Sequence, residues 1–116
     1  MSDDVRWVTV LADKELLEGD LLDVEIDGQA VLLLRLIGGT VKAFQATCPH
    51  QGSLLADGDW DTDSNVLTCP SHLWEFDVRD GRGVNPQNCR LREYLVRLNG
   101  DRLDIAVPAG TGTTRR

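Results

Sequence analysis

Two short stretches decide how this chain folds and what it holds: TCPHQG at residues 47–52 and TCPSHLW at residues 68–74. Each stretch joins one cysteine to one histidine across a proline, and together they contain both histidines of the 116-residue chain. Soft thiolates and imidazoles are ligands that suit zinc or an iron–sulfur cluster. We therefore predict a metal site formed by Cys48, His50, Cys69 and His72.

The spacing of these ligands helps to choose between the two kinds of metal site. A zinc finger usually opens with two cysteines and closes with two histidines, whereas here each stretch supplies one of each. A binuclear cluster can use this arrangement by placing both cysteines on one iron and both histidines on the other. A zinc-bound structural module remains the alternative, since it needs only four ligands on one metal.

The charge of such a cluster indicates its chemistry. Two ferric ions, two sulfides, two thiolates and two neutral imidazoles sum to about zero, so the cluster is easier to reduce than one with four thiolates. No nucleophile elbow or phosphate-binding glycine motif accompanies the ligands. We therefore expect an electron carrier with one [2Fe–2S] cluster, and not an enzyme.

The sequence outside the ligand stretches predicts an all-β fold. Apolar residues separated by turn signals predict strands at residues 7–10, 21–26, 30–37, 41–46, 65–68, 74–78, 91–98 and 103–107. The run at 30–37 is continuously apolar, which predicts a strand buried on both faces. Residues 12–19 are expected to form a helical turn or loop with Asp13 as its cap. Regular short strands of this kind indicate a sandwich or barrel.

The length and composition bound the organisation of the chain. Residues 1–107 are expected to form a single domain, with a cluster-binding part at about 46–76, and residues 108–116 a flexible tail. The net charge of −7 and the absence of a basic patch argue against nucleic-acid binding. No signal peptide or membrane-spanning run is visible, so we expect a cytoplasmic protein.

Three cysteines do not make a disulfide framework, and Cys89 is spare once the ligands are assigned. We expect it to be a free thiol. Trp74 is expected to pack over the ligand loop, with three leucines forming an apolar collar near the ligands: Leu54, Leu55 and Leu73. Four aspartates follow, at 57, 59, 61 and 63; they either face a basic partner or form a solvated loop.

The ligand stretches resemble those of the Rieske ferredoxin family, and the resemblance extends over roughly residues 5–107. It implies an antiparallel β-sandwich with a small cluster-binding subdomain at its tip. It also implies that Cys48 and Cys69 bind one iron, and that His50 and His72 bind the other.

Four short segments resemble more specifically the ferredoxins of bacterial toluene and alkene monooxygenases: VKAFQA at 41–46, CPHQ at 48–51, HLW at 72–74 and GVNP at 83–86. This resemblance implies a monomeric carrier between an NADH-dependent flavin or iron–sulfur reductase and a diiron hydroxylase, in a system that oxidises aromatic hydrocarbons or alkenes. The alternative is a ferredoxin that serves a ring-hydroxylating Rieske dioxygenase.

Some positions depart from related patterns. Leu73 stands where many Rieske ferredoxins have glycine, and the monooxygenase ferredoxins share this departure, although they often lack a proline at the position of Pro70. Ser53 and Ser71 stand where respiratory Rieske proteins have two bridging cysteines. Trp74 and Phe76 stand where those proteins have hydroxyls that bond the cluster, so the resemblance implies a potential in the lower part of the Rieske range.

Overall fold

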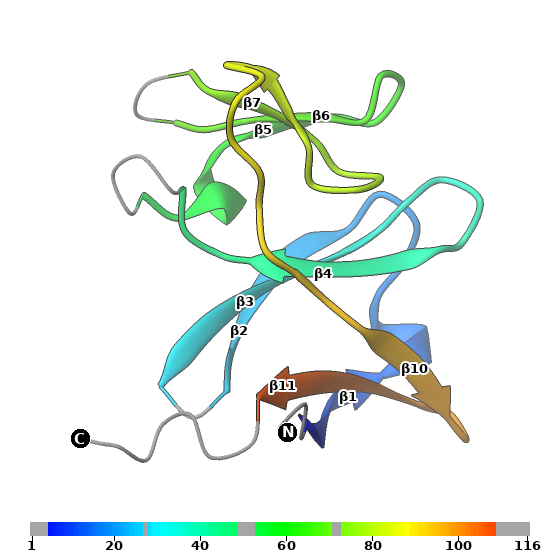
Figure 1. Ribbon diagram of the computed structural model, residues 1–116. Coiled ribbons are helices and arrows are strands. Elements are labelled where there is room, and N and C mark those ends of the chain that lie inside the picture. Colours follow the sequence, from blue (N-terminus) through cyan, green and yellow to red (C-terminus); the bar gives the residue numbers. More distant parts are fainter. Residues whose placement is uncertain (1–4, 27, 49–52, 71–72, 109–116) are drawn as a thin grey trace.

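The computed structural model describes residues 5–26, 28–48, 53–70 and 73–108. These residues form three antiparallel sheets (Figure 1). The first sheet has the order β1-β11-β10, the second β2-β3-β4-β9 and the third β5-β6-β7-β8. The strands are β1 (Val5–Ala12), β2 (Leu21–Ile26), β3 (Gln29–Arg35), β4 (Val41–Gln45), β5 (Asp59–Asp61), β6 (Val66–Thr68), β7 (Glu75–Asp77), β8 (Gly83–Asn85), β9 (Glu93–Tyr94), β10 (Val96–Asn99) and β11 (Arg102–Pro108). The prediction of an all-β, antiparallel fold is confirmed.

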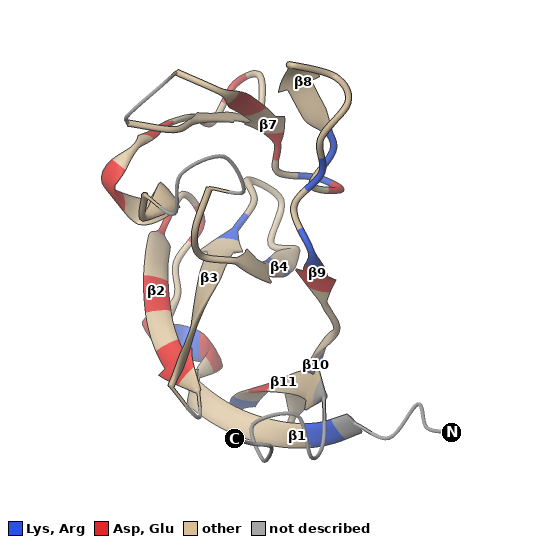
Figure 2. Ribbon diagram, turned by 60° about the vertical axis from the view of Figure 1, so that its left-hand side comes forward, with Lys and Arg blue, Asp and Glu red and all other residues tan. Residues whose placement is uncertain are grey.

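The sheet that contains β3 is the middle layer of the molecule. Figures 1 and 2 show the β1-β11-β10 sheet on one side of it and the β5–β8 sheet on the other. Successive side chains of a strand point to opposite faces. Accordingly, Val31 and Leu33 belong to the core shared with β11, whereas Leu32 and Leu34 belong to the core shared with β6 and β7. All four are fully buried, which confirms the predicted two-sided burial and explains the continuous apolar run.

Two predicted elements differ from the structure. The strand expected at 91–98 is divided into β9 and β10, which pair with different sheets. The turn after β1 is the short 3-10 helix η1 (Asp13–Glu15), and Asp13 does not cap it. The Glu15 carboxylate instead accepts a hydrogen bond from the N–H of Ala12, at 2.9 Å, while the Asp13 carboxylate pairs with Arg35. The Asp13 carboxylate therefore pairs with the Arg35 guanidinium and does not accept a hydrogen bond from the first turn of η1.

Two short strands, β5 and β8, fall in segments that the sequence did not mark as strands. Each has three residues and pairs with a neighbour in the third sheet. A second 3-10 helix, η2 (Leu55–Asp57), precedes β5. Within the described ranges, no helix is long and apolar enough to cross a membrane.

Candidate metal centre

The first ligand loop leaves the middle sheet at the end of β4. Thr47 pairs with Leu54 across the base of the loop, and the N–H of Leu55 donates to the carbonyl of Ala46 at 2.8 Å. One step further in, the N–H of Cys48 donates to the carbonyl of Ser53 at 2.8 Å. Cys48 is therefore held at the neck of a loop whose remaining residues, 49–52, lie outside the described ranges and include His50.

The second ligand loop joins β6 to β7 and has the same closure. Thr68 pairs with Glu75 at its base, and the N–H of Cys69 donates to the carbonyl of Trp74 at 2.7 Å. In both loops the cysteine N–H thus bonds the carbonyl five residues ahead. Ser71 and His72 lie outside the described residues.

Packing brings the two cysteines into one core, although they come from different sheets. Cys48 is 2% exposed and Cys69 is fully buried. Both belong to a cluster that also contains Leu55, Leu67 and Phe76. Two thiols held at the necks of matching loops, in an apolar surrounding, fit the cysteine half of a metal centre with sulfur ligands.

The histidine half of the site is not tested by the structure. Among the described residues no group of three or more metal-binding side chains is found, as expected when His50 and His72 fall outside those ranges. The structure thus places Cys48 and Cys69 together, and the assignment of both histidines stays a prediction.

Cys89 is a free thiol that is partly buried beside the same core. Its Sγ donates to the carbonyl of Pro86 at 3.3 Å, and burial raises the pKa of the thiol. Its position outside the ligand set stays a prediction.

The leucine collar is only partly as predicted. Leu55 is fully buried in the core, but Leu54 is 39% exposed and Leu73 is 67% exposed. Leu73 has a φ of 60°, the left-handed region that normally favours glycine. The side chain of Leu73 is thus exposed, and it lines a shallow hollow together with Cys69 and Pro70. Trp74, by contrast, packs against the core as expected.

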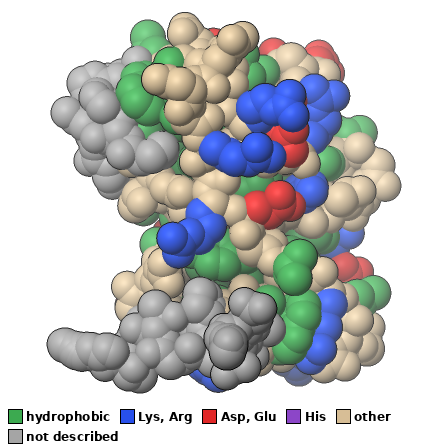
Figure 3. Space-filling view, viewed as in Figure 1, with side chains coloured by type: hydrophobic (Ala, Val, Ile, Leu, Met, Phe, Trp, Pro, Cys, Tyr) green, Lys and Arg blue, Asp and Glu red, His purple; other side chains and the backbone are tan. Residues whose placement is uncertain are grey.

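Charge is unevenly distributed around the two loops. No lysine or arginine occurs between Lys42 and Arg79, whereas this interval contains six acidic residues: Asp57, Asp59, Asp61, Asp63, Glu75 and Asp77. The first four of these, Asp57, Asp59, Asp61 and Asp63, are all exposed. Basic side chains gather instead on the face shown in Figure 3, and Figure 2 shows the acidic positions along β2 and the β5–β8 sheet.

Arg79 begins the basic segment and is tied to the acidic one. Its guanidinium donates to Asp77 at 2.7 Å, and this hydrogen bond lowers the pKa of the Asp77 carboxyl. The interval that carries the cysteines is thus acidic up to this ion pair, and its exposed aspartates either face a basic partner or form a solvated loop.

Sequence reasoning missed two residues that shape the site. The side chain of Gln45 donates to the carbonyl of Thr47 at 2.9 Å and accepts from the N–H of Arg92 at 2.8 Å, which ties the first loop to the segment before β9. Gly58 lies against the strand that leads to Cys69. Of the two, only Gly58 could have been noticed in the sequence, because a glycine between two aspartates indicates a turn.

The family model that matches this chain is the Rieske [2Fe–2S] domain, over residues 6–95. This chain belongs to the Rieske [2Fe–2S] family. Its cofactor is therefore one Rieske-type [2Fe–2S] cluster, and the zinc alternative is wrong. The buried cysteine pair described above fits this cofactor.

Two relatives that match over most of both chains are ferredoxins. The ferredoxin component of the alkene monooxygenase system of Xanthobacter autotrophicus is 36% identical, with 89% of this chain and 83% of the relative covered. The ferredoxin component of the naphthalene 1,2-dioxygenase system of Pseudomonas aeruginosa is 30% identical, with coverage of 86% and 94%.

A solved ferredoxin structure agrees with this comparison. The ferredoxin of carbazole 1,9a-dioxygenase from Nocardioides aromaticivorans superimposes with a TM-score of 0.79 at 29% identity, over 88% of this chain and 98% of that one. By contrast, the chain spans only 25% of the carnitine monooxygenase oxygenase subunit of Escherichia coli, to which it is 36% identical. The resemblance there is to one part of a much larger protein.

Proposed function

We propose that this chain is a Rieske ferredoxin that carries single electrons from an NADH-dependent flavin reductase to the diiron hydroxylase of a toluene- or alkene-type monooxygenase. The observation that carries the proposal is the pair of matching loops that buries Cys48 and Cys69 in one core. When bound, the cluster takes up and releases one electron. The protein bears no other chemistry in this proposal, so it is a carrier and not an enzyme.

The cluster ligands in this proposal are Cys48 and Cys69 on one iron, and His50 and His72 on the other. The prolines that follow the cysteines, Pro49 and Pro70, remove backbone N–H groups and stiffen the loops. Residues 46–76 act as the cluster-binding part of a single domain formed by residues 1–107. We further propose a monomer that works in the cytoplasm.

The choice of a monooxygenase partner is supported by the alkene monooxygenase ferredoxin, which is 36% identical over most of both chains. A specific observation also favours the second candidate, a ferredoxin for a ring-hydroxylating dioxygenase. Ferredoxins of naphthalene and carbazole dioxygenases cover this chain almost as fully, at 30% and 29% identity. A ferredoxin that is 25% identical to this chain is also known in a complex with the oxygenase of carbazole 1,9a-dioxygenase. Both candidates require the same cluster and differ only in the acceptor.

Substitution of the ligands tests the cluster assignment. We expect Cys48→Ala, Cys69→Ala, His50→Ala and His72→Ala to lose the visible absorption of the cluster and the low average g value of its reduced EPR spectrum. Cys89→Ala is the matched control, because its thiol is outside the ligand set, and it should keep both signals. A histidine variant with an unchanged EPR spectrum would contradict the assignment of that histidine.

Exchange of components tests the partner. The chain would replace the native ferredoxin in two reconstituted systems, the alkene monooxygenase of Xanthobacter autotrophicus and the naphthalene 1,2-dioxygenase of Pseudomonas aeruginosa, and NADH-dependent turnover would be measured. Faster turnover in the alkene system supports the diiron partner. Faster turnover in the naphthalene system would replace it by the dioxygenase partner.

A further inference from the structure

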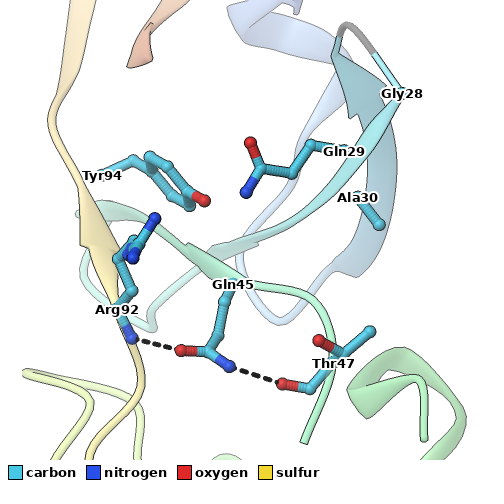
Figure 4. Close-up of a pocket in the computed structure, with 7 residues that line it drawn as sticks. All are labelled: Gly28, Gln29, Ala30, Gln45, Thr47, Arg92 and Tyr94. Carbon is cyan, nitrogen blue, oxygen red and sulfur yellow. Dashed lines mark hydrogen bonds between the residues drawn. The ribbon is translucent and has the colours of Figure 1, made fainter. Parts of the chain in front are cut away.

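Gln45 is the last residue of β4, and its side chain bonds two different segments of the chain (Figure 4). Its Nε2 donates to the carbonyl oxygen of Thr47 at 2.9 Å. Its side-chain oxygen accepts a hydrogen bond from the backbone N–H of Arg92 at 2.8 Å. The backbone N–H of Gln45 donates in turn to the carbonyl of Arg92, also at 2.8 Å. One residue thus connects the entry of the first ligand loop with the segment before β9.

The peptide unit between Thr47 and Cys48 is held at both of its polar groups. Its carbonyl oxygen accepts the hydrogen bond from Gln45, and its N–H donates to the carbonyl of Ser53 at 2.8 Å. The carbonyl, the N–H and the two flanking Cα atoms of a peptide unit lie in one plane. Partners on both groups therefore fix this plane, and with it the Cα atom of Cys48. The bond from Gln45 comes from a side chain, so a substitution can remove it.

The segment before β9 is itself attached to the third sheet. The N–H of Gly83 in β8 donates to the carbonyl of Cys89 at 2.9 Å, and Leu91 of the same segment is buried in the core that contains both ligand cysteines. Gln45 therefore links the loop of one cysteine to a segment that is attached to the sheet leading to the other.

We propose that Gln45 is a positioning residue for Cys48, and that it holds this ligand in place for the cluster through the carbonyl of Thr47. Outer residues that orient metal ligands typically change metal affinity by about 10- to 100-fold when they are substituted, because the ligand is then held less precisely. The inference rests on the proposed assignment of Cys48 as a cluster ligand. It assigns to Gln45 an effect on the cluster beyond its contribution to the fold.

Two substitutions at residue 45 separate the hydrogen bonds from the charge. Gln45→Glu keeps the shape of the side chain and an oxygen that can accept from Arg92, but it replaces the donor by an oxygen that repels the carbonyl of Thr47. Gln45→Met removes both side-chain bonds without adding a charge. Gln29→Glu is the matched control, since it adds the same charge to the same hollow. Gln29 is exposed, and its side chain makes no hydrogen bond among the residues drawn in Figure 4.

The cluster-containing protein gives two readouts that a purely structural role would not move. The first is the rate at which EDTA removes the visible absorption of the oxidised cluster. The second is the visible circular dichroism of that cluster, which reports how the cysteine sulfurs are oriented around the iron. We expect both Gln45 variants to lose the cluster about tenfold faster than the wild type and to have an altered dichroism spectrum. Gln29→Glu should match the wild type in both measurements.

Thermal unfolding of the same variants identifies a role in the fold alone. A lower unfolding temperature in Gln45→Met, with the wild-type dichroism and the wild-type rate of cluster loss, would overturn the proposal. Equal changes in Gln45→Glu and Gln29→Glu would also overturn it, because the added charge would then explain them. Cys48→Ala separates this inference from the ligand assignment. If that variant keeps its cluster, the assignment of Cys48 fails; if it loses the cluster while both Gln45 variants behave as the wild type, only the positioning role fails.

Discussion

The backbone of Gly58 lies directly against the carbonyl group of Thr68. A Cβ atom on Gly58 would stand 2.0 Å from that oxygen and 3.2 Å from the carbonyl oxygen of Leu55. Gly58 follows η2, which continues the first ligand loop, and Thr68 is the residue before Cys69. The φ of Gly58 is −89°, so the requirement for glycine is one of space and not of backbone conformation. This contact sets how closely the two loops approach.

Gly58→Ala should therefore disturb the site more than a single methyl group usually does. We expect the strand before Cys69 to be pushed away, at a cost of about 1–3 kcal/mol in the free energy of unfolding, together with a lower cluster content. Iron analysis and thermal unfolding would measure both effects. Gly28→Ala is a useful comparison, because Gly28 has a φ of 82° but open space around it. If Gly58→Ala keeps its full cluster content and unfolds at the same temperature as Gly28→Ala, the contact between Gly58 and Thr68 does not set the distance between the two loops.

Particular residues show why part of this structure could be predicted from the sequence. The alternation on β2 and the continuous apolar run on β3 report which faces are buried, and burial acts locally on each residue type. The contact between Gly58 and Thr68 depends on two segments meeting in space, so a glycine between two aspartates reads only as a turn. Strands β5 and β8 have three residues each, and only pairing with their neighbours defines them. Residue type and spacing predict the two cysteines as ligands, and the structure adds that both are buried in one core.

Leu73 tests the strain beside the second ligand loop. Its φ of 60° suits glycine, and its side chain is 67% exposed. Leu73→Gly should therefore lose little packing, and its free energy of unfolding should stay within about 0.5 kcal/mol of the wild-type value or exceed it. Leu73→Val, with a β-branched side chain in the same conformation, should be destabilised by about 1–2 kcal/mol. Chemical unfolding would measure both variants, and equal stabilities would argue against strain at this residue.

Asp104 should make the stability of the β1-β11-β10 sheet depend on acid. Its carboxylate is buried and accepts hydrogen bonds from Thr9 at 2.7 Å, Arg97 at 3.1 Å and Asn99 at 3.2 Å. These bonds, that of Thr9 foremost, lower the pKa of Asp104 from its ordinary 3.8. The stabilisation is therefore fully present above pH 3.8 and is lost as the pH falls through the lowered, folded-state pKa.

Removal of the strongest donor checks this origin. Thr9→Val should raise the pKa of Asp104 toward its ordinary value, and ¹³C NMR of the aspartate carboxyls would follow the titration. Thr62→Val changes a threonine in the turn between β5 and β6, outside the sheet that contains Asp104, and should leave the Asp104 titration unchanged. An Asp104 pKa that is the same in Thr9→Val and the wild type would show that the hydroxyl does not hold the carboxylate ionised.

The reduction potential of the cluster should fall in the lower part of the Rieske range, which extends from about −150 to +300 mV. Hydrogen bonds from hydroxyls to the cluster stabilise its reduced, more negative form and so raise the potential. Neither Trp74 nor Phe76 has a hydroxyl for such a bond; Phe76 is fully buried in the core that contains Cys48 and Cys69, and Trp74 packs against it. Protein-film voltammetry would measure the potential of the wild type and of Phe76→Tyr, in which we expect the added hydroxyl to raise the potential. A wild-type potential near the upper end of the range would mean that other donors stabilise the reduced cluster.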